Sequence, residues 1–346
     1  MKINGRQVGE GAPAYIIAEM SGNHAGSIER AKDIIYAAKE CGADCIKIQT
    51  YTADTMTIDC DNPYFQITEG TWEGENLYKL YQKAFTPWEW QEELSKEAKK
   101  VGIDFLSTPF DQTSVDFLEK LELPFYKIAS FELVDIPLLE YIASKKKPIV
   151  MSTGMGSLEE IEEAIEAIYG QGNHDLALMK CSSAYPAKRE QMNLRTIKDM
   201  QERFHVPVGL SDHSMGSFSA TTAVALGASI IEKHFCLSRT IKNPDCTFSM
   251  EPHEFKQMVE EIREVEKALG KVSYGVSKQE EYNTRFRRSL FVVKDIAAGE
   301  TLTKDNIRSI RPSNGLKPKY MKDVLGKKAN KPLAKGTPLS FEDIEG

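Results

Sequence analysis

The sequence predicts a (β/α)8 TIM barrel followed by a small C-terminal domain. Before residue 270, eight short apolar runs of the kind that form buried parallel strands alternate with eight helix-length segments. After residue 288 the pattern changes, and a short internal repeat follows. A doubly wound open sheet is the competing architecture, but the first strand is followed by MSGNHAG, which lacks the G-x-G-x-x-G spacing of a dinucleotide-binding turn.

The expected elements follow one another regularly along the chain. We expect strands at residues 15–18, 45–48, 104–106, 125–128, 148–151, 176–179, 206–210 and 229–231. We expect helices at residues 28–40, 87–100, 114–121, 136–144, 158–169, 194–204, 217–226 and 252–269. Eight such units within about 270 residues are typical of a TIM barrel.

One connection is much longer than the others. Residues 50–86 separate the second strand from its helix and include YTADTM, TWEGENLYKLYQ and AFTPWEW. A connection of this length in a compact domain is usually functional, and this one leaves the carboxyl end of a strand, where barrel enzymes build their sites. We therefore interpret it as a candidate lid, with a structural excursion over the barrel wall as the alternative.

The chain is expected to divide into a barrel at residues 1–270, a polar linker at 271–288 and a second domain at 289–346. Within the second domain, residues 295–307 resemble residues 332–344, so that Gly299 matches Gly336 and Leu302 matches Leu339. A domain of about 60 residues has a marginal core of its own. We expect it to pack on the barrel or on a second subunit.

Composition and charge argue against several classes of protein. The net charge of −7 gives no general support for nucleic-acid binding. No run approaches about 18 apolar residues, and the N-terminal MKINGRQVGEG has no signal-peptide core, so we expect no membrane segment. The six cysteines form no C-x-x-C pair, which indicates a reducing cytoplasm without disulfides.

Two histidines stand at the ends of successive strands. His213 follows VPVGLSD and His234 ends SIIEKH, with a helix-length segment of small residues between them. Such a β-α-β unit makes the two strands parallel, so both imidazoles should lie at the same end of the barrel, where they can bind one divalent cation. The alternative is two unrelated buried histidines that are bonded to the backbone.

Polar side chains end all eight expected strands. A mixture of lysine, serine and threonine suits a phosphate, because the lysines supply charge and the hydroxyls supply directed hydrogen bonds. Lysines inside barrels can instead bridge carboxylates, and Lys47 and Lys127 have that alternative. The pattern predicts a metal-dependent barrel enzyme with a phosphorylated or anionic substrate. The strand-end residues are Glu19, Lys47, Gln49, Thr108, Lys127, Ser130, Ser152, Thr153, Lys180, Ser182, Ser183, Tyr185, Ser211, Asp212, His213, Glu232 and His234.

The same stretches resemble those of a known family. In order they read IIAEMSGNHAGS, CIKIQTYTADTM, TPWEW, FLSTPFD, YKIASFE, MSTGM, KCSSAYP, VGLSDHS, ALGASIIEKHF, RRSL and RPSNGLKP. Together they are similar to the sialic acid synthase family, and most similar to its pseudaminic acid synthase branch. The resemblance covers essentially the whole chain and implies that the C-terminal domain is an antifreeze-like (SAF, β-clip) domain.

The resemblance implies a transferase of carbohydrate biosynthesis, of the kind that supports flagellin glycosylation. In such enzymes C3 of phosphoenolpyruvate attacks the aldehyde of an open-chain acetamido sugar, water attacks C2, and phosphate leaves with cleavage of the C–O bond. The product is a nine-carbon 2-keto acid. The pseudaminic branch implies 2,4-diacetamido-2,4,6-trideoxy-L-altrose as the sugar. The alternative is a synthase of N-acetylneuraminic or legionaminic acid, with N-acetylmannosamine or a 2,4-diacetamido-mannose analogue as the sugar.

The resemblance also implies roles for individual residues. Glu19 matches a catalytic carboxylate, and His213 and His234 match catalytic residues that bind a divalent metal, Mn²⁺, Co²⁺ or Mg²⁺. The implied phosphoenolpyruvate ligands are Lys47, Thr108, Lys127, Ser130, Ser152 and Ser211. The implied sugar-side residues are Gln49, Ser183, Tyr185, Asp245 and Arg311.

Among the implied sugar-side residues, Arg311 lies outside the barrel. It belongs to the SAF domain, which in the family covers the barrel of the partner subunit, so the resemblance implies a homodimer. The chain departs from sialic acid synthases at Ser183 and Cys246, where they tend to carry Asn and His. Both departures fall on the sugar side, which puts N-acetylmannosamine in doubt. A carbohydrate-binding or regulatory protein with an inactive barrel is the non-enzyme alternative, and the presence of Glu19, His213 and His234 argues against it.

Overall fold

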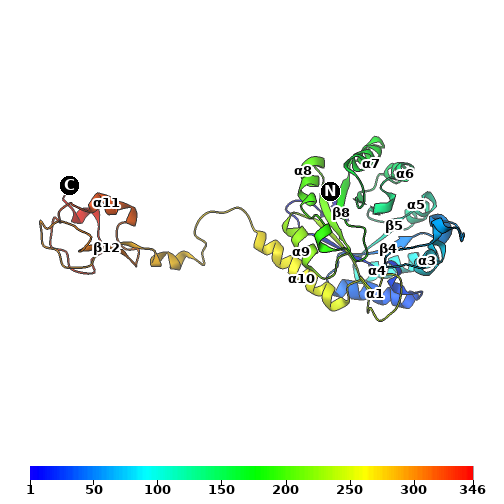
Figure 1. The fold of residues 1–346 in the computed structure, drawn as a ribbon, viewed down its shortest axis with the longest axis horizontal. Helices are drawn as coiled ribbons and strands as arrows, with labels where there is room; N and C mark the ends of the chain where they lie inside the picture. Colours follow the sequence, from blue (N-terminus) through cyan, green and yellow to red (C-terminus); the bar gives the residue numbers. More distant parts are fainter. Residues whose placement is uncertain (346) are drawn as a thin grey trace. The chain divides into compact units, whose positions relative to one another are not determined.

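The computed structural model describes residues 1–345, which fall into two compact units, the first of them Met1–Gly270. The first unit contains eight parallel strands in the order β5-β4-β3-β10-β9-β8-β7-β6. Strand β10 pairs with strand β3, and strands β5 and β6, at the two ends of this order, lie in contact. The sheet is therefore a nearly closed barrel, with the helices arranged around it (Figure 1). The predicted fold class is confirmed.

Five of the eight barrel strands (β3, β4, β5, β8 and β10) are longer than the apolar runs that predicted them. They are β3 Tyr15–Glu19, β4 Cys45–Thr50, β5 Asp104–Pro109, β6 Tyr126–Ile128, β7 Ile149–Ser152, β8 Leu176–Cys181, β9 Val208–Asp212 and β10 Ile230–His234. The outer helices are α1 Ile28–Glu40, α4 Trp88–Val101, α5 Gln112–Glu119, α6 Ile136–Ser144, α7 Leu158–Gly170, α8 Thr196–Phe204, α9 Phe218–Ala225 and α10 Pro252–Leu269. Most strands continue beyond the predicted apolar run into polar residues at their carboxyl ends, which places these residues inside the barrel sheet.

The register of the strands brings selected polar residues side by side. Glu19 pairs with Lys47 on one side and with His234 on the other, and Glu232 pairs with Ser211. Because alternate residues of a strand face opposite sides of the sheet, one set of polar ends faces the barrel interior. The intervening Lys233 faces outward, where its Nζ lies 2.7 Å from Asp212 Oδ2. Asp212 is therefore not part of the interior group.

One close approach in the barrel wall requires glycine. A Cβ on Gly209 of β9 would lie 2.5 Å from the carbonyl oxygen of Ile230 in β10. Any larger residue there would push β9, which His213 follows, away from β10, which ends at His234. The barrel core around them is a single apolar cluster that includes Ile17, Met179 and Ile231.

The long connection after β4 is ordered by two helices. These are α2 Ala53–Met56 and α3 Leu77–Ala84, and the residues between them form a looped segment whose strand-like ends meet at Gln66 and Asn76. A short hairpin, β1 Lys2–Ile3 and β2 Arg6–Gln7, precedes the barrel. No helix within residues 1–345 combines the length and the apolar character that crossing a bilayer requires.

The second unit begins at Lys271 and has its own small core. It contains the antiparallel pair β11 Ser289–Val292 and β12 Ile307–Ile310, the one-turn helix α11 Met321–Val324, and short 3-10 turns. Gly299 and Gly336 have positive φ angles of 80° and 91°, and Leu302 and Leu339 are fully buried. The internal repeat thus corresponds to two equivalent turns that each send a leucine into the same core.

Candidate active site

The interior strand ends form a buried network of charges. Lys47 Nζ lies 2.7 Å from Glu19 Oε2 and 3.6 Å from Glu232 Oε1, and it donates a 3.2 Å hydrogen bond to Thr108 Oγ1. Lys127 Nζ lies 3.9 Å from the same Glu232 oxygen. All five side chains are buried. Both ammonium groups therefore lie close to buried carboxyl groups.

Hydroxyl groups surround this network. Lys127 Nζ donates to Ser152 Oγ at 2.7 Å, and Ser211 Oγ donates to Glu232 Oε1 at 3.4 Å. Ser130 Oγ accepts a 3.1 Å hydrogen bond from the amide of Gly154, on which a Cβ would lie only 2.7 Å from the same oxygen. Two lysines, four hydroxyls and a nearby backbone amide make a cradle suited to a phosphate or a carboxylate.

Glu232 is a central residue to which the sequence analysis gave no individual role. It contacts both lysines and Ser211, and its Oε2 atom is buried without a hydrogen-bond partner. Its position in β10, two residues before His234, places both side chains on the interior face. That spacing is the one signal in the sequence that could have identified it.

Burial and charge act on the two carboxylates differently. Burial raises the pKa of Glu19 above its ordinary value, although the Lys47 ammonium opposes the shift. Burial also disfavours the charged form of Glu232, but Lys127 and Lys47 outweigh it and lower the pKa of that carboxyl. The pair therefore divides into one carboxyl that can hold a proton and one that stays ionised between the lysines.

The two histidines lie beside each other at the same end of the barrel. The ring centroids of His213 and His234 are 5.4 Å apart, and both side chains are buried. The Nδ1 atom of His213 is 3.1 Å from the carbonyl oxygen of Ser182, which fixes the orientation of the ring. His234 stands in register with Glu19, so the histidine pair adjoins the charged network.

The histidine pair has the chemistry of a partial metal site. The Nδ1 atom of His234 is buried without a hydrogen-bond partner, and imidazole nitrogen is a common ligand of divalent transition metals. No group of three or more His, Cys, Asp and Glu side chains within residues 1–345 is placed to hold a metal ion. The residues therefore fit a site with two protein ligands that leaves other coordination positions to water or substrate.

The sugar-side residues implied by the resemblance are only partly brought together. Gln49 Nε2 donates to Glu19 Oε1 at 2.9 Å, and the Tyr185 ring lies 4.3 Å from the His213 ring. Ser183 Oγ lies 3.6 Å from the thiol of Cys181, a neighbour of His213. Asp245 is buried and accepts a 2.9 Å hydrogen bond from the amide of Gly22, so it supports the loop after β3. Arg311 belongs to the second unit, where its side chain is exposed.

Glu132 is a second carboxylate without a role in the sequence analysis. It ends the 3-10 turn Ser130–Glu132 after β6, and its Oε2 atom is buried without a hydrogen-bond partner. Burial raises its pKa to about 7. A carboxyl that titrates near neutral pH beside a phosphate cradle is suited to proton transfer. The motif SFE after Lys127 carries no pattern that separates it from an ordinary turn.

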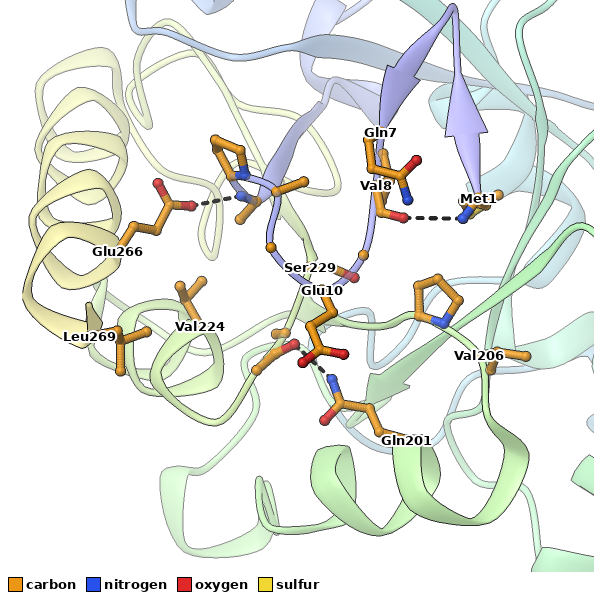
Figure 2. Close-up of a pocket in the computed structure, with 18 of the residues that line it drawn as sticks. Met1, Gln7, Val8, Glu10, Gln201, Val206, Val224, Ser229, Glu266 and Leu269 are labelled. Atoms are coloured by element: carbon orange, nitrogen blue, oxygen red, sulfur yellow. Dashed lines mark hydrogen bonds between the residues drawn. The ribbon is translucent and has the colours of Figure 1, made fainter. Parts of the chain in front are cut away.

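A cavity of about 1010 Å³ lies at the opposite end of the barrel. It is bordered by the segments that enter β3, β9 and β10, and Figure 2 shows Glu10, Gln201 and Glu266 on its wall. Glu266 accepts a 2.6 Å hydrogen bond from Ala14, and Gln201 donates one to Gly227. Because the polar groups of Glu266 and Gln201 are engaged by the chain itself, we assign the site to the carboxyl ends of the strands.

Comparison with known proteins agrees with this location. The model of the NeuB family matches residues 34–274, which is most of the barrel. The chain belongs to the NeuB family. The SAF domain model matches residues 287–345 within the second unit. Both parts of the resemblance found in the sequence are thereby confirmed.

The NeuB chain has relatives with several names. It is 46% identical over 334 residues to the pseudaminic acid synthase of Helicobacter pylori, covering 96% of this chain and 98% of that protein. It is 37% identical over 350 residues to an N,N'-diacetyllegionaminic acid synthase of Legionella pneumophila, covering 99% and 98%. These relatives are synthases, which makes this NeuB protein an enzyme.

A solved structure of the family has the same fold. The N-acetylneuraminic acid synthetase of Leptospira borgpetersenii, solved with citrate, aligns with a TM-score of 0.73 at 29% identity, covering 82% of this chain and 94% of that one. The NeuB assignment therefore rests on sequence and on three-dimensional structure together.

Proposed function

We propose that this enzyme is a pseudaminic acid synthase. It would condense phosphoenolpyruvate with 2,4-diacetamido-2,4,6-trideoxy-L-altrose and release phosphate by cleavage of the C–O bond, as a C–C bond-forming transferase. The observation that carries the proposal is the buried cradle of Lys47, Lys127 and hydroxyls beside the histidine pair. The choice of sugar is supported by the 46% identity to the Helicobacter pylori enzyme and by Ser183 and Cys246 on the sugar side.

In this proposal the cradle binds phosphoenolpyruvate. Lys47 and Lys127 would contact its phosphate and carboxylate, and the hydroxyls would orient them and stabilise the charge that grows on the departing phosphate. The ligands are Lys47, Thr108, Lys127, Ser130, Ser152 and Ser211. Anion binding would also loosen the contacts of Lys47 with Glu19, since the same ammonium group would serve both.

Glu19 is the carboxyl best placed to move a proton. Its Oε1 accepts from Gln49 and its Oε2 faces Lys47, so its position is fixed from both sides. Burial raises its pKa, which allows the group to hold a proton and return it during the reaction. We assign it the removal of a proton from the water that attacks C2 of the enolpyruvyl group.

His213 and His234 would hold a divalent metal, Mn²⁺, Co²⁺ or Mg²⁺. When bound, such an ion supplies a Lewis acid next to the sugar aldehyde. The Ser182 carbonyl orients the His213 ring for this role, and the neighbouring Tyr185 ring excludes water from one side of the pair.

The proposed reaction is tested with a panel of sugars. Phosphate release is followed with phosphoenolpyruvate, a divalent metal and each of three sugars: the trideoxy-L-altrose, N-acetylmannosamine and the 2,4-diacetamido-mannose analogue. We expect release to require all components and to be fastest with the altrose sugar. Faster turnover of N-acetylmannosamine would favour a neuraminic acid synthase, and faster turnover of the mannose analogue a legionaminic acid synthase.

We further propose a homodimer in which the second unit of the partner subunit covers the barrel. Residues 271–346 contain 16 Lys and Arg against 9 Asp and Glu, and residues 1–270 contain the other 28 and 42, so the net charges are +7 and −14. Opposite net charges favour association of the two kinds of unit. Loops at the site end of the barrel also expose Phe131, Val134 and Met155 by 59%, 59% and 63%, as expected of a surface that another chain covers.

Arg311 is the residue that such an arrangement would bring to the sugar. We expect Arg311→Ala to raise the KM of the sugar more than the KM of phosphoenolpyruvate, because its contact is with the sugar. Arg308→Ala, an exposed arginine of the same unit, is the matched control and should change neither constant. Equal effects of Arg311→Ala on both substrates would contradict the sugar contact.

Complementation tests whether Arg311 acts across the dimer. At a sugar concentration far below the KM of the Arg311→Ala enzyme, chains with Arg311→Ala and chains with His234→Ala should each show little activity. If they are co-expressed, a mixed dimer would contain one barrel with both histidines, covered by a second unit with Arg311. About a quarter of wild-type activity should return, since half of the dimers are mixed and each has one complete site. No recovery would contradict the exchange of units.

A further inference from the structure

The looped segment at residues 66–76 has the form of a tongue. Its base is closed by the bridge between Gln66 and Asn76 and by a 2.9 Å hydrogen bond from the Ile67 amide to the Glu75 carbonyl. Asn76 is buried and donates to the Cys60 carbonyl at 2.9 Å. Trp72 lies near the tip, between two glycines with positive φ angles at residues 70 and 74. The base is fixed, and the glycines allow the sharp turns that present Trp72.

The tip of the tongue reaches two other loops of the barrel. Trp72 Nε1 donates a 2.9 Å hydrogen bond to the carbonyl of Pro244, in the loop after β10. Thr71 Oγ1 donates to the carbonyl of Tyr185, in the loop after β8. The Trp72 ring lies 5.4 Å from the Tyr185 ring and 6.4 Å from the Phe248 ring. Residues more than 100 positions apart thus meet on the sugar side of the site.

These rings form a continuous aromatic wall that begins at the histidines. Phe248 lies 5.0 Å from His234 and 5.3 Å from Tyr185, and Tyr185 lies 4.3 Å from His213. The wall of Trp72, Tyr185 and Phe248 differs in character from the ionic cradle, which adjoins His234 through its register with Glu19. Aromatic rings provide apolar area for the C–H faces and methyl groups of a ligand.

The order of the rings decides which part of the sugar meets Trp72. The aldehyde carbon must react with the enolpyruvyl group held in the cradle, so it lies next to the histidines. A sugar chain that follows the wall from the histidines would extend past Tyr185 toward Trp72. The end of the sugar farthest from the aldehyde would then meet the Trp72 ring.

We propose that Trp72 is a specificity-determining residue that selects an acetamido sugar with a deoxygenated, methyl-bearing end. This inference rests on the proposed function and names the feature of the sugar that the tongue recognises. A methyl group against the indole is favourable, whereas a hydroxyl in the same place loses water without gaining a partner. Selection by an apolar wall against an added hydroxyl is moderate, on the order of 10- to 100-fold.

The test compares two 2,4-diacetamido sugars that differ only at C6, one with a methyl and one with a hydroxymethyl group. For Trp72→Ala we expect kcat/KM with the methyl sugar to fall on the order of 10- to 100-fold, mainly through the KM of the sugar. The ratio of kcat/KM between the two sugars should approach one, and the KM of phosphoenolpyruvate should stay within about twofold. Trp72→Phe should keep most of the selectivity, and Tyr64→Ala, an aromatic residue of the same connection that is 90% exposed, should keep all of it.

An unchanged sugar ratio in Trp72→Ala, or an equal rise in both KM values, would show a merely structural clamp and overturn the inference. A binding measurement separates this result from failure of the proposed function. The chain has three tryptophans, so the difference in fluorescence between wild type and Trp72→Phe reports Trp72. We expect the methyl sugar to change this signal without phosphoenolpyruvate. If no sugar is turned over, the proposed function fails; if no sugar changes the Trp72 signal either, the inference fails with it.

Discussion

Replacing Glu19 with glutamine is expected to lower kcat about 1000-fold while the barrel remains folded. Glutamine has nearly the same shape, so packing is preserved, and Lys47 keeps its contacts with Glu232 and Thr108. What is lost is a carboxyl that can accept and return a proton. The KM of phosphoenolpyruvate should change much less than kcat, because Lys47 and Lys127 still carry the charge that binds the anion.

The matched control is a carboxylate at the other end of the barrel. Asp104, at the start of β5, accepts hydrogen bonds from Tyr15 Oη at 2.5 Å and from Asn4 Nδ2 at 2.7 Å. Asp104→Asn should lower the thermal midpoint of unfolding and leave kcat unchanged. If Glu19→Gln kept wild-type kcat at a matched temperature, the role assigned to this carboxyl would be wrong.

The second large effect is expected at the histidine pair. His213→Ala and His234→Ala would each remove one of the two protein ligands proposed for the metal, and a site with so few ligands would have little affinity left. We expect the affinity for Mn²⁺ to fall at least 100-fold, since changes to residues that only support a ligand already cost 10- to 100-fold. Turnover should fall with it. Bound metal is measured in the purified protein after equilibrium dialysis, alongside kcat.

His253→Ala provides the control, because His253 is exposed on α10 and outside the site. It should bind metal and turn over as the wild type does. Treatment of the wild type with a chelator should abolish activity, and added Mn²⁺, Co²⁺ or Mg²⁺ should restore it. Wild-type metal content in both His213→Ala and His234→Ala would favour two ordinary buried histidines.

The sequence was sufficient for the barrel because the information is local. An apolar, β-branched run predicts each strand, and an amphipathic segment between turns predicts each helix. The carboxyl ends of the strands were harder to predict from the sequence. Strand β9 continues to Asp212 and β10 to His234, although polar residues end both apolar runs. Hydrogen bonds to neighbouring strands carry the sheet into the polar residues, and those bonds depend on partners far away in the sequence.

The site was only partly predictable for the same reason. The lysines, hydroxyls and histidines could be expected at one end of the barrel because parallel strands share a direction. Glu232 and Glu132 could be identified as site residues only from the burial of their carboxyl groups, which a single sequence does not reveal. The meeting of Trp72 with Tyr185 and Phe248 depends on the path of a long connection, which no local pattern specifies.

In the proposed reaction, phosphoenolpyruvate reacts at C3, while its phosphate is held in the Lys47–Lys127 cradle and leaves by C–O cleavage. This reaction is tested most directly with phosphoenolpyruvate labelled with ¹⁸O in the bridge between C2 and phosphorus. The enzyme is given this substrate, metal and the trideoxy-L-altrose, and the phosphate is analysed by ³¹P NMR. We expect the label to appear in the released phosphate. Unlabelled phosphate, with the ¹⁸O retained in the keto acid, would mean P–O cleavage and would contradict it.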